Sequence, residues 1–236
     1  MLREIDKNIW VAEQPFKYLG LEVGTRMTII RLLNGELIII SPIQTDEQTI
    51  NQLNAIGKVA YIIAPNLYHH LFISKFKAIY PNAKLWIPPG LESKIPNMSI
   101  DKVISVSSGN IFEQIDYLLF DGFKILDLTG ISILNEFVFF HRQSHTLILT
   151  DTAFHFDKSF SLRTRLAAKF LGVYEKLTPS PLEKLAINEK EKVKNSIQNV
   201  LRWNFNRVIM AHGSIIEDSG NQKLKKGYET FLGTSL

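Results

Sequence analysis

Residues 59–70 read V-A-Y-I-I-A-P-N-L-Y-H-H, an apolar run that stops at Pro65-Asn66 and leads into a histidine pair. A short, continuous apolar run of this kind is typical of a strand that is covered on both faces. Similar apolar runs at 36–41 and 83–87 predict two further strands. The segments between the runs, 45–57 and 67–80, have apolar residues at helical spacing and predict helices. This order predicts a β-α-β-α-β unit with a parallel sheet, which places the chain in the α/β class.

The pattern continues on both sides of this unit. Asn34-Gly35 and Asp121-Gly122 each separate two apolar runs, and such dipeptides predict hairpins. Strand-like runs fill 102–151, a helical pattern follows from 157 to 185, and R-V-I-M-A-H-G (207–213) predicts a short buried strand that ends at His212. No internal repeat or linker interrupts the chain, so we predict one domain over residues 1–236.

Composition limits the classes of function. The chain has 236 residues, 45% of them hydrophobic, which is enough for a substantial core. It has no cysteine, so disulfides, thiolate nucleophiles and cysteine-based zinc sites are excluded. The net charge of +4 is spread without a block of like charges, so no nucleic acid partner is expected. Because no signal peptide or transmembrane segment is apparent, we expect a cytoplasmic protein; its oligomeric state is left open.

Three polar sites come directly after apolar strands. His69-His70 follow the first run, Asp151 follows T-L-I-L-T, and His212 follows R-V-I-M-A. Ligands of α/β proteins gather at the carboxyl ends of strands, so these side chains are candidates for one site. Imidazoles with one carboxylate suit Zn²⁺, Fe²⁺ or Mn²⁺.

Each of these residues also has a purely structural interpretation. The histidine pair can begin a helix with Asn66 as its N-cap, Asp151 can cap a turn, and His212 can be a buried histidine at a strand end. Four further residues are weaker candidates for the site. Glu136 is expected to pair with a buried histidine or arginine, and His141 and His145 are expected at the surface. His155 comes four residues after Asp151 and is within reach of the site, but a position outside it is the expectation.

The motifs resemble those of a known superfamily. The order of a strand, a segment opened by two histidines, P-P-G, L-I-L-T-D-T-A-F and V-I-M-A-H-G is similar to the metallo-β-lactamase superfamily over nearly the whole chain. A-P-N-L-Y-H-H, E-F-V-F-F-H-R-Q-S-H-T-L-I-L-T-D and L-R-T-R-L-A-A-K-F-L-G-V-Y resemble the DUF4336 family more closely, an uncharacterised branch of that superfamily. The resemblance implies an αββα four-layer sandwich.

The chain departs from the superfamily pattern H-x-H-x-D-H. Pro65 and Leu67 stand where the first two histidines belong, and His69 stands at the aspartate. The middle histidine is expected near residues 130–134, where G-I-S-I-L contains none. The resemblance therefore implies that one of two metal positions is lost. The other is left with a His for Asp exchange, and its ligands would be His69, His70, Asp151 and His212.

Two functions follow from this set. If His69 points away, then His70, Asp151 and His212 form a three-ligand site with a position left for water, as catalysis needs. The chain is then a metal-dependent, hydrolase-like protein with at most one metal position and an unknown small-molecule substrate. The alternative is a non-catalytic protein of this fold with a binding or structural role, with or without metal.

The segment 156–187 forms a separate question. Within it, Leu162, Leu166 and Phe170 repeat at helical spacing, with Arg163, Arg165 and Lys169 between them. This amphipathic pattern is consistent with a solvated helix, with a helical lid inserted over the site, or with a contact to an anionic partner.

Overall fold

The computed structural model describes residues 1–127, 130–180 and 189–236. A seven-stranded mixed sheet forms one half of the molecule, in the order β1-β2-β5-β6-β7-β8-β9. Its strands up to β6 pair antiparallel, and those from β6 onward pair in parallel, as the β-α-β-α-β pattern predicts. The strands are β1 (Leu2–Asp6), β2 (Ile9–Gln14), β5 (Thr25–Arg31), β6 (Glu36–Ile40), β7 (Lys58–Ile63), β8 (Lys84–Ile87) and β9 (Lys102–Val103).

A five-stranded sheet of order β10-β11-β14-β15-β16 forms the other half. Its pairs are antiparallel except for β15 and β16, which run in parallel. The strands are β10 (Ser108–Ile111), β11 (Ile115–Phe120), β14 (Glu136–His141), β15 (Thr146–Ile148) and β16 (Arg207–Ile209). Two small hairpins stand apart from both sheets: β3 (Lys17–Tyr18) with β4 (Leu21–Glu22), and β12 (Lys124–Asp127) with β13 (Gly130–Ile133).

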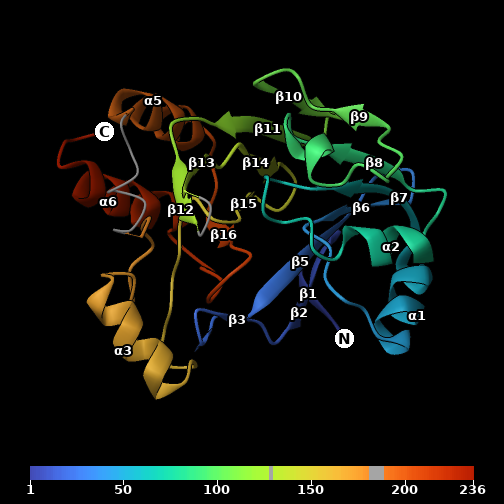
Figure 1. Cartoon of the computed structure of the whole chain (residues 1–236), viewed down its shortest axis with the longest axis horizontal. Helices are drawn as coiled ribbons and strands as arrows, with labels where there is room; N and C mark the ends of the chain where they lie inside the picture. The colour runs from blue at the N-terminus through green and yellow to red at the C-terminus, as the bar shows by residue number, and fades with distance from the viewer. Residues whose placement is uncertain (128–129, 181–188) are drawn as a thin grey trace.

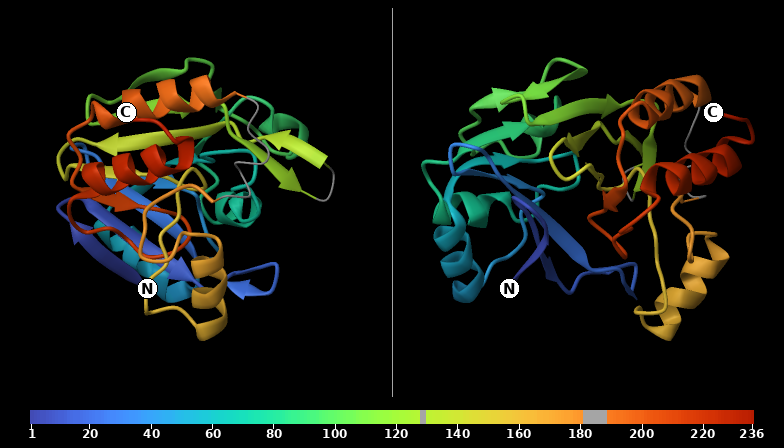
Figure 2. Two further views of the ribbon diagram at one scale, coloured as in Figure 1. Left: turned by 90° about the vertical axis from the view of Figure 1, so that its left-hand side faces the viewer. Right: turned by 180° about the vertical axis from the view of Figure 1, so that it is seen from behind.

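Helices cover the outer faces of the two sheets, which gives the expected four layers (Figure 1). The right-hand view of Figure 2 shows the same succession of helices, sheet, sheet and helices. The helices α1 (Glu47–Ile56) and α2 (Ile73–Ile79) pack on the first sheet, and α5 (Lys190–Leu201) and α6 (Gly220–Leu232) pack on the second. A short 3-10 helix, η1 (Leu91–Ser93), follows β8, and α3 (Leu162–Phe170) lies outside the layers.

The continuous apolar strands have one hydrophobic core on each face. In β6, Ile38 and Ile40 face the core between the sheets, whereas Leu37 and Ile39 face the core under α1 and α2. This alternation is the period of two that a strand imposes on its side chains. The continuous apolar run 37–40 in β6 therefore reflects two buried faces. Within the described parts of the chain, none of the helices combines the length and the apolar composition that a membrane crossing needs.

One of the two predicted hairpins is confirmed and the other is wrong. Asn34-Gly35 joins β5 to β6 as an antiparallel pair. Asp121-Gly122 does not join paired strands, because β11 pairs with β10 and β14 while β12 pairs with β13. A Cβ atom at Gly122 would lie 2.9 Å from the backbone nitrogen of Val193. Glycine is needed here for the close approach to α5.

The helix predicted at 67–80 is shorter in the structure. It begins only at Ile73, and residues 67–72 form turns that carry both histidines of the pair. The helical pattern predicted from 157 to 185 yields α3 alone among the residues described there. Residues 181–187, the last part of the segment 156–187, lie outside the described residues.

His141 is buried, contrary to the expectation of a surface position. It is the last residue of β14 and still pairs with a neighbour on each side, Ile115 in β11 and Thr146 in β15, and its side chain is 1% exposed. Its Nδ1 lies 2.7 Å from Oγ of Ser144. Burial lowers the pKa of His141 to about 4, and the nearby charge of Asp6 opposes this shift only in part. His145, by contrast, is exposed as predicted.

We expect His141 to reduce the free energy of unfolding as the pH falls from 6.5 toward about 4. The unfolded chain takes up a proton at this residue below its usual pKa near ~6.5, whereas the folded chain does not, so acid favours unfolding. In a His141→Gln variant, the loss of stability between about pH 7 and about pH 5 should be smaller by about 2 kcal/mol. Urea unfolding of both proteins at the two pH values measures this difference, and equal losses would contradict the assignment.

Candidate functional site

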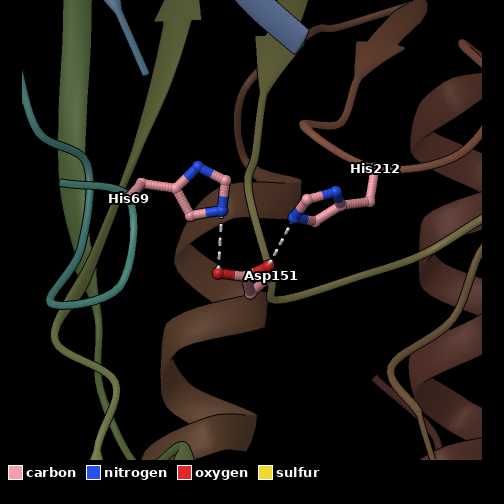
Figure 3. Close-up of side chains that lie close together, drawn as sticks. All are labelled: His69, Asp151 and His212. Carbon is pink, nitrogen blue, oxygen red and sulfur yellow. Dashed lines mark ion pairs between the residues drawn. The ribbon is translucent and has the colours of Figure 1, made fainter. Parts of the chain in front are cut away.

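Three side chains from both halves of the molecule meet at one edge of the two sheets (Figure 3). His69 lies in the loop after β7, Asp151 follows β15 and His212 follows β16. The Nε2 atom of His69 lies 3.2 Å from Oδ2 of Asp151, and Nε2 of His212 lies 3.7 Å from Oδ1. One ligand atom from each residue lies within 4.8 Å of the other two. We call these residues the His-Asp-His cluster.

His69 is aimed by two hydrogen-bonded neighbours. The Oδ1 atom of Asn66 accepts from the backbone N–H groups of Tyr68 and His69, at 2.8 and 2.9 Å, which fixes the turn that carries the histidine. The Nδ1 atom of His69 lies 2.7 Å from Oγ of Ser41 at the end of β6. Ser41 has a φ of +56°, a left-handed backbone conformation that residues other than glycine seldom adopt. Nε2 of His69 therefore faces Asp151.

Asp151 is held in place by Asn66 and Glu136. The Asn66 amide donates to Oδ2 of Asp151 at 2.8 Å, and the backbone N–H of Asp151 donates to Oε2 of Glu136 at 2.7 Å. Glu136 is 0% exposed and also accepts from the backbone of Thr150 at 2.9 Å and from the hydroxyl of Thr152 at 2.8 Å. All these partners donate, so the carboxylate of Glu136 organises the turn after β15.

His212 is held through its other ring nitrogen. Its Nδ1 donates to the carbonyl oxygen of Gly24 at 2.6 Å, because a carbonyl can only accept. The guanidinium of Arg26 donates to the carbonyl oxygens of Met210 and Gly213 on either side of the histidine. Gly213 has a φ of +86°, and a Cβ atom there would collide with the carbonyl of His155. Nε2 is therefore the nitrogen that faces Asp151 and that is unprotonated whenever the ring is neutral.

The charges of the cluster are strongly coupled. Burial acts to raise the pKa of Asp151, but the charges of His69 and His212 and the bonds from His69 and Asn66 outweigh it and bring that pKa to about 2. Burial lowers the pKa of His212. Burial also acts to lower the pKa of His69, but the adjacent Asp151 carboxylate more than offsets this and raises it. Asp151 is therefore ionised across the physiological range.

This donor set fits a divalent metal ion. It offers two imidazole Nε2 atoms and one carboxylate, which are borderline ligands suited to Zn²⁺ or Fe²⁺. At 3.7 Å, Nε2 of His212 is too far from Asp151 for a good hydrogen bond, so its lone pair is available to a cation. Each ring also has its remote nitrogen bonded to a protein oxygen, as metal-binding histidines usually do.

The structure differs from the sequence interpretation over the histidine pair. His69, Asp151 and His212 come together, whereas His70 is not part of the cluster. The ring of His70 is half-buried, and its Nδ1 has no hydrogen-bond partner among the described residues. Burial and the nearby charge of Lys94 lower its pKa. Residues 67–72 form turns, and within them the ring of His69 faces Asp151 whereas the ring of His70 does not join the cluster. His155 likewise stays outside the cluster, with Nδ1 3.3 Å from the carbonyl of Ser214.

Sequence reasoning missed the residues that hold the cluster together. Asn66 does satisfy backbone N–H groups as an N-cap would, but it serves a turn and also binds Asp151. Glu136 has a buried partner as expected, but that partner is a set of backbone N–H and side-chain donors and not a histidine or arginine. The available signal for Glu136 was a carboxylate directly before the apolar run F-V-F-F. Nothing in the sequence points to Ser41.

Comparison with known proteins adds the family and the fold. The family described as "Domain of unknown function (DUF4336)" matches residues 6–167. No curated protein matches the chain. Similar solved structures include the DIM-1 metallo-β-lactamase exposed to ceftazidime, with a TM-score of 0.66 and 13% identity over 98% of this chain and 96% of that one.

Two further solved structures lead to the same fold. A metallo-β-lactamase from Pontibacter korlensis has a TM-score of 0.66 and 13% identity, over 99% of this chain and 98% of that one. FIM-1 from Pseudomonas aeruginosa, in its mono-zinc form, has a TM-score of 0.61 and 10% identity, over 99% and 93%. This chain therefore has the metallo-β-lactamase fold.

Proposed function

The chain belongs to the DUF4336 family, and from this membership and its metallo-β-lactamase fold we propose that it is a hydrolase-like protein with a single divalent metal ion. The ligands are His69, Asp151 and His212, and the metal is Zn²⁺, Fe²⁺ or Mn²⁺. The observation that supports this proposal is the convergence of three oriented, largely buried donor atoms within 4.8 Å. The predicted ligand His70 is replaced in this proposal by its neighbour His69.

The protein residues have separate tasks at such a site. His69 and His212 would hold the ion as neutral imidazoles, and Asp151 would supply one negative charge, so a divalent ion would leave a net charge of +1. Asn66 and Glu136 keep the Asp151 carboxylate at its place, and Ser41 and the Gly24 carbonyl orient the two rings. Because only three protein side chains would hold the ion, a position would remain for water, and the chemistry supplied there would be activation of that water for hydrolysis.

The surroundings offer room for a small molecule. A cavity of about 190 Å³ adjoins the loop of His212 and is lined in part by Gly24, Arg26, Phe160, Ala211 and Gly213. The three cluster residues do not line this cavity, which lies beside the cluster. We propose a small-molecule substrate that reaches the cluster from this side.

A second candidate is a non-catalytic protein of the same fold. One observation favours it: Nε2 of His69 lies 3.2 Å from Oδ2 of Asp151, so the two side chains can satisfy each other as an ion pair. In this case the cluster has a structural task, and the pair holds the two sheets together at this edge.

Metal content and stability of the unmodified protein separate the two candidates. Protein purified without added metal should contain close to one equivalent of a divalent metal. After chelation, returning the metal at about 100 times its Kd should raise the free energy of unfolding by about 2.7 kcal/mol. If the purified protein is free of metal and its unfolding does not respond to Zn²⁺, Fe²⁺ or Mn²⁺, the metal-dependent candidate is ruled out and the non-catalytic one is supported. Mg²⁺, which prefers oxygen ligands, serves as the control ion.

A further inference from the structure

The helix α3 packs in an inverted manner. Its buried residues are the small Thr164 and Ala168, whereas its large apolar residues Leu162, Leu166 and Phe170 are 65, 58 and 91% exposed. Helices that pack on a protein core place their large apolar side chains inward. The sequence of α3 has an apolar face that the rest of the described chain leaves uncovered.

The exposed apolar residues of α3 form one stripe. Residues four apart on a helix are offset by about 40°, so Leu162, Leu166 and Phe170 cover about 80° of the surface. Thr164 and Ala168 lie on the opposite side of the helix and hold it to the body. The hydroxyl of Thr164 donates to the carbonyl of Glu22 in β4 at 3.1 Å.

The β3–β4 hairpin next to α3 also exposes apolar side chains. Its turn presents Tyr18 and Leu19, which are 52 and 79% exposed. Figure 1 and both views of Figure 2 show this hairpin and α3 side by side, projecting from the layered body. We call the stripe on α3 the α3 platform, defined by Leu162, Leu166 and Phe170.

Basic residues flank the stripe on both sides. By the helical spacing of about 100° per residue, Arg163 lies beside one edge of the stripe, and Arg165 and Lys169 lie beside the other. The helix itself contains no acidic residue. From 157 to 176 the chain has five basic residues, Lys158, Arg163, Arg165, Lys169 and Lys176, against two acidic ones, Asp157 and Glu175.

We propose that the α3 platform binds the surface of a bilayer that contains anionic phospholipids. The apolar stripe would enter the boundary between headgroups and acyl chains, and the exposed Arg163 and Lys169 at its two edges would face the phosphates. Interfacial helices combine these two features, an exposed apolar face and basic residues at its edges. The positive flanks disfavour a second copy of the same surface, because like charges would meet.

Vesicle sedimentation tests this proposal on the full chain. We expect binding to vesicles of phosphatidylcholine with phosphatidylglycerol, weak binding to phosphatidylcholine alone, and release at raised salt. A Leu166→Ser/Phe170→Ser variant should bind at least about tenfold more weakly. An Arg163→Gln/Lys169→Gln variant should lose affinity for the anionic vesicles only.

The matched control replaces exposed apolar residues elsewhere. Leu33 and Val106 are 82 and 59% exposed, in the β5–β6 turn and between β9 and β10, away from α3. A Leu33→Ser/Val106→Ser variant should bind vesicles as the unmodified protein does. Circular dichroism confirms that each variant is folded.

Three results would overturn the proposal. They are no binding of the unmodified protein to anionic vesicles, equal binding by the Leu166→Ser/Phe170→Ser variant, and a dimer in solution that this variant disperses without any vesicle binding. The last result would make the α3 platform a contact between subunits. None of these readouts depends on metal, so the test is independent of the proposed hydrolase-like function.

Discussion

Replacing His69, Asp151 or His212 with alanine, one at a time, is expected to weaken metal binding by more than about 100-fold, because loss of an outer-shell partner alone costs about 10- to 100-fold. Each substitution removes one of three donors and leaves two, which no longer enclose a divalent ion. Metal content after purification and a competition titration with a chromogenic chelator measure the effect. All three variants should also lose the gain in stability that added metal gives to the unmodified protein.

His70→Ala is the matched control for this series. It removes the same type of side chain from the adjacent position of the same loop, yet His70 is outside the cluster. We expect its metal content to equal that of the unmodified protein. If His70→Ala loses metal while His69→Ala keeps it, the histidine assigned from the sequence motif is the ligand and the assignment made here is wrong.

A Glu136→Leu variant is expected to lose about 3–5 kcal/mol of unfolding free energy. Leucine has a similar size but accepts no hydrogen bond. The N–H groups of Thr150 and Asp151 and the hydroxyl of Thr152 would then be buried without partners. Urea unfolding of the chelated protein measures the loss without a contribution from metal.

Two further variants show whether the effect belongs to this carboxylate. Glu4 lies on the exposed part of β1, and Glu4→Leu should change stability by less than about 0.5 kcal/mol. Glu136→Gln keeps one acceptor oxygen and should fall between Glu136→Leu and the unmodified protein. A Glu136→Leu protein as stable as the unmodified one would show that the turn after β15 does not depend on Glu136.

Much of the fold follows from local patterns in the sequence. The parallel β6-β7-β8 unit was predicted because its strands are continuous apolar runs separated by helical periodicity. The prediction of a hairpin at Asp121-Gly122 was wrong, because Gly122 is needed for close contact with α5, which comes about 70 residues later in the chain. Contacts between such distant segments leave no periodic signal.

The candidate site likewise has residues whose positions follow from local patterns and residues whose positions depend on distant contacts. Asp151 and His212 were placed correctly, since a polar residue directly after an apolar strand lies at the strand's end. The choice between His69 and His70 could not be made, because it depends on how the loop turns. That turn is set by Asn66, whose side chain bonds to residues as distant as 136 and 151.

The residue at position 41 in related chains is expected to show whether the His-Asp-His cluster is still under selection. Its left-handed backbone costs on the order of 1 kcal/mol, which glycine at this position would not incur. Glycine, however, lacks the hydroxyl that Ser41 places 2.7 Å from Nδ1 of His69. Selection for folding alone would let position 41 drift to glycine, whereas selection for the oriented histidine would keep serine. The residue at this position in descendants of the same ancestor therefore records whether the cluster is still under selection.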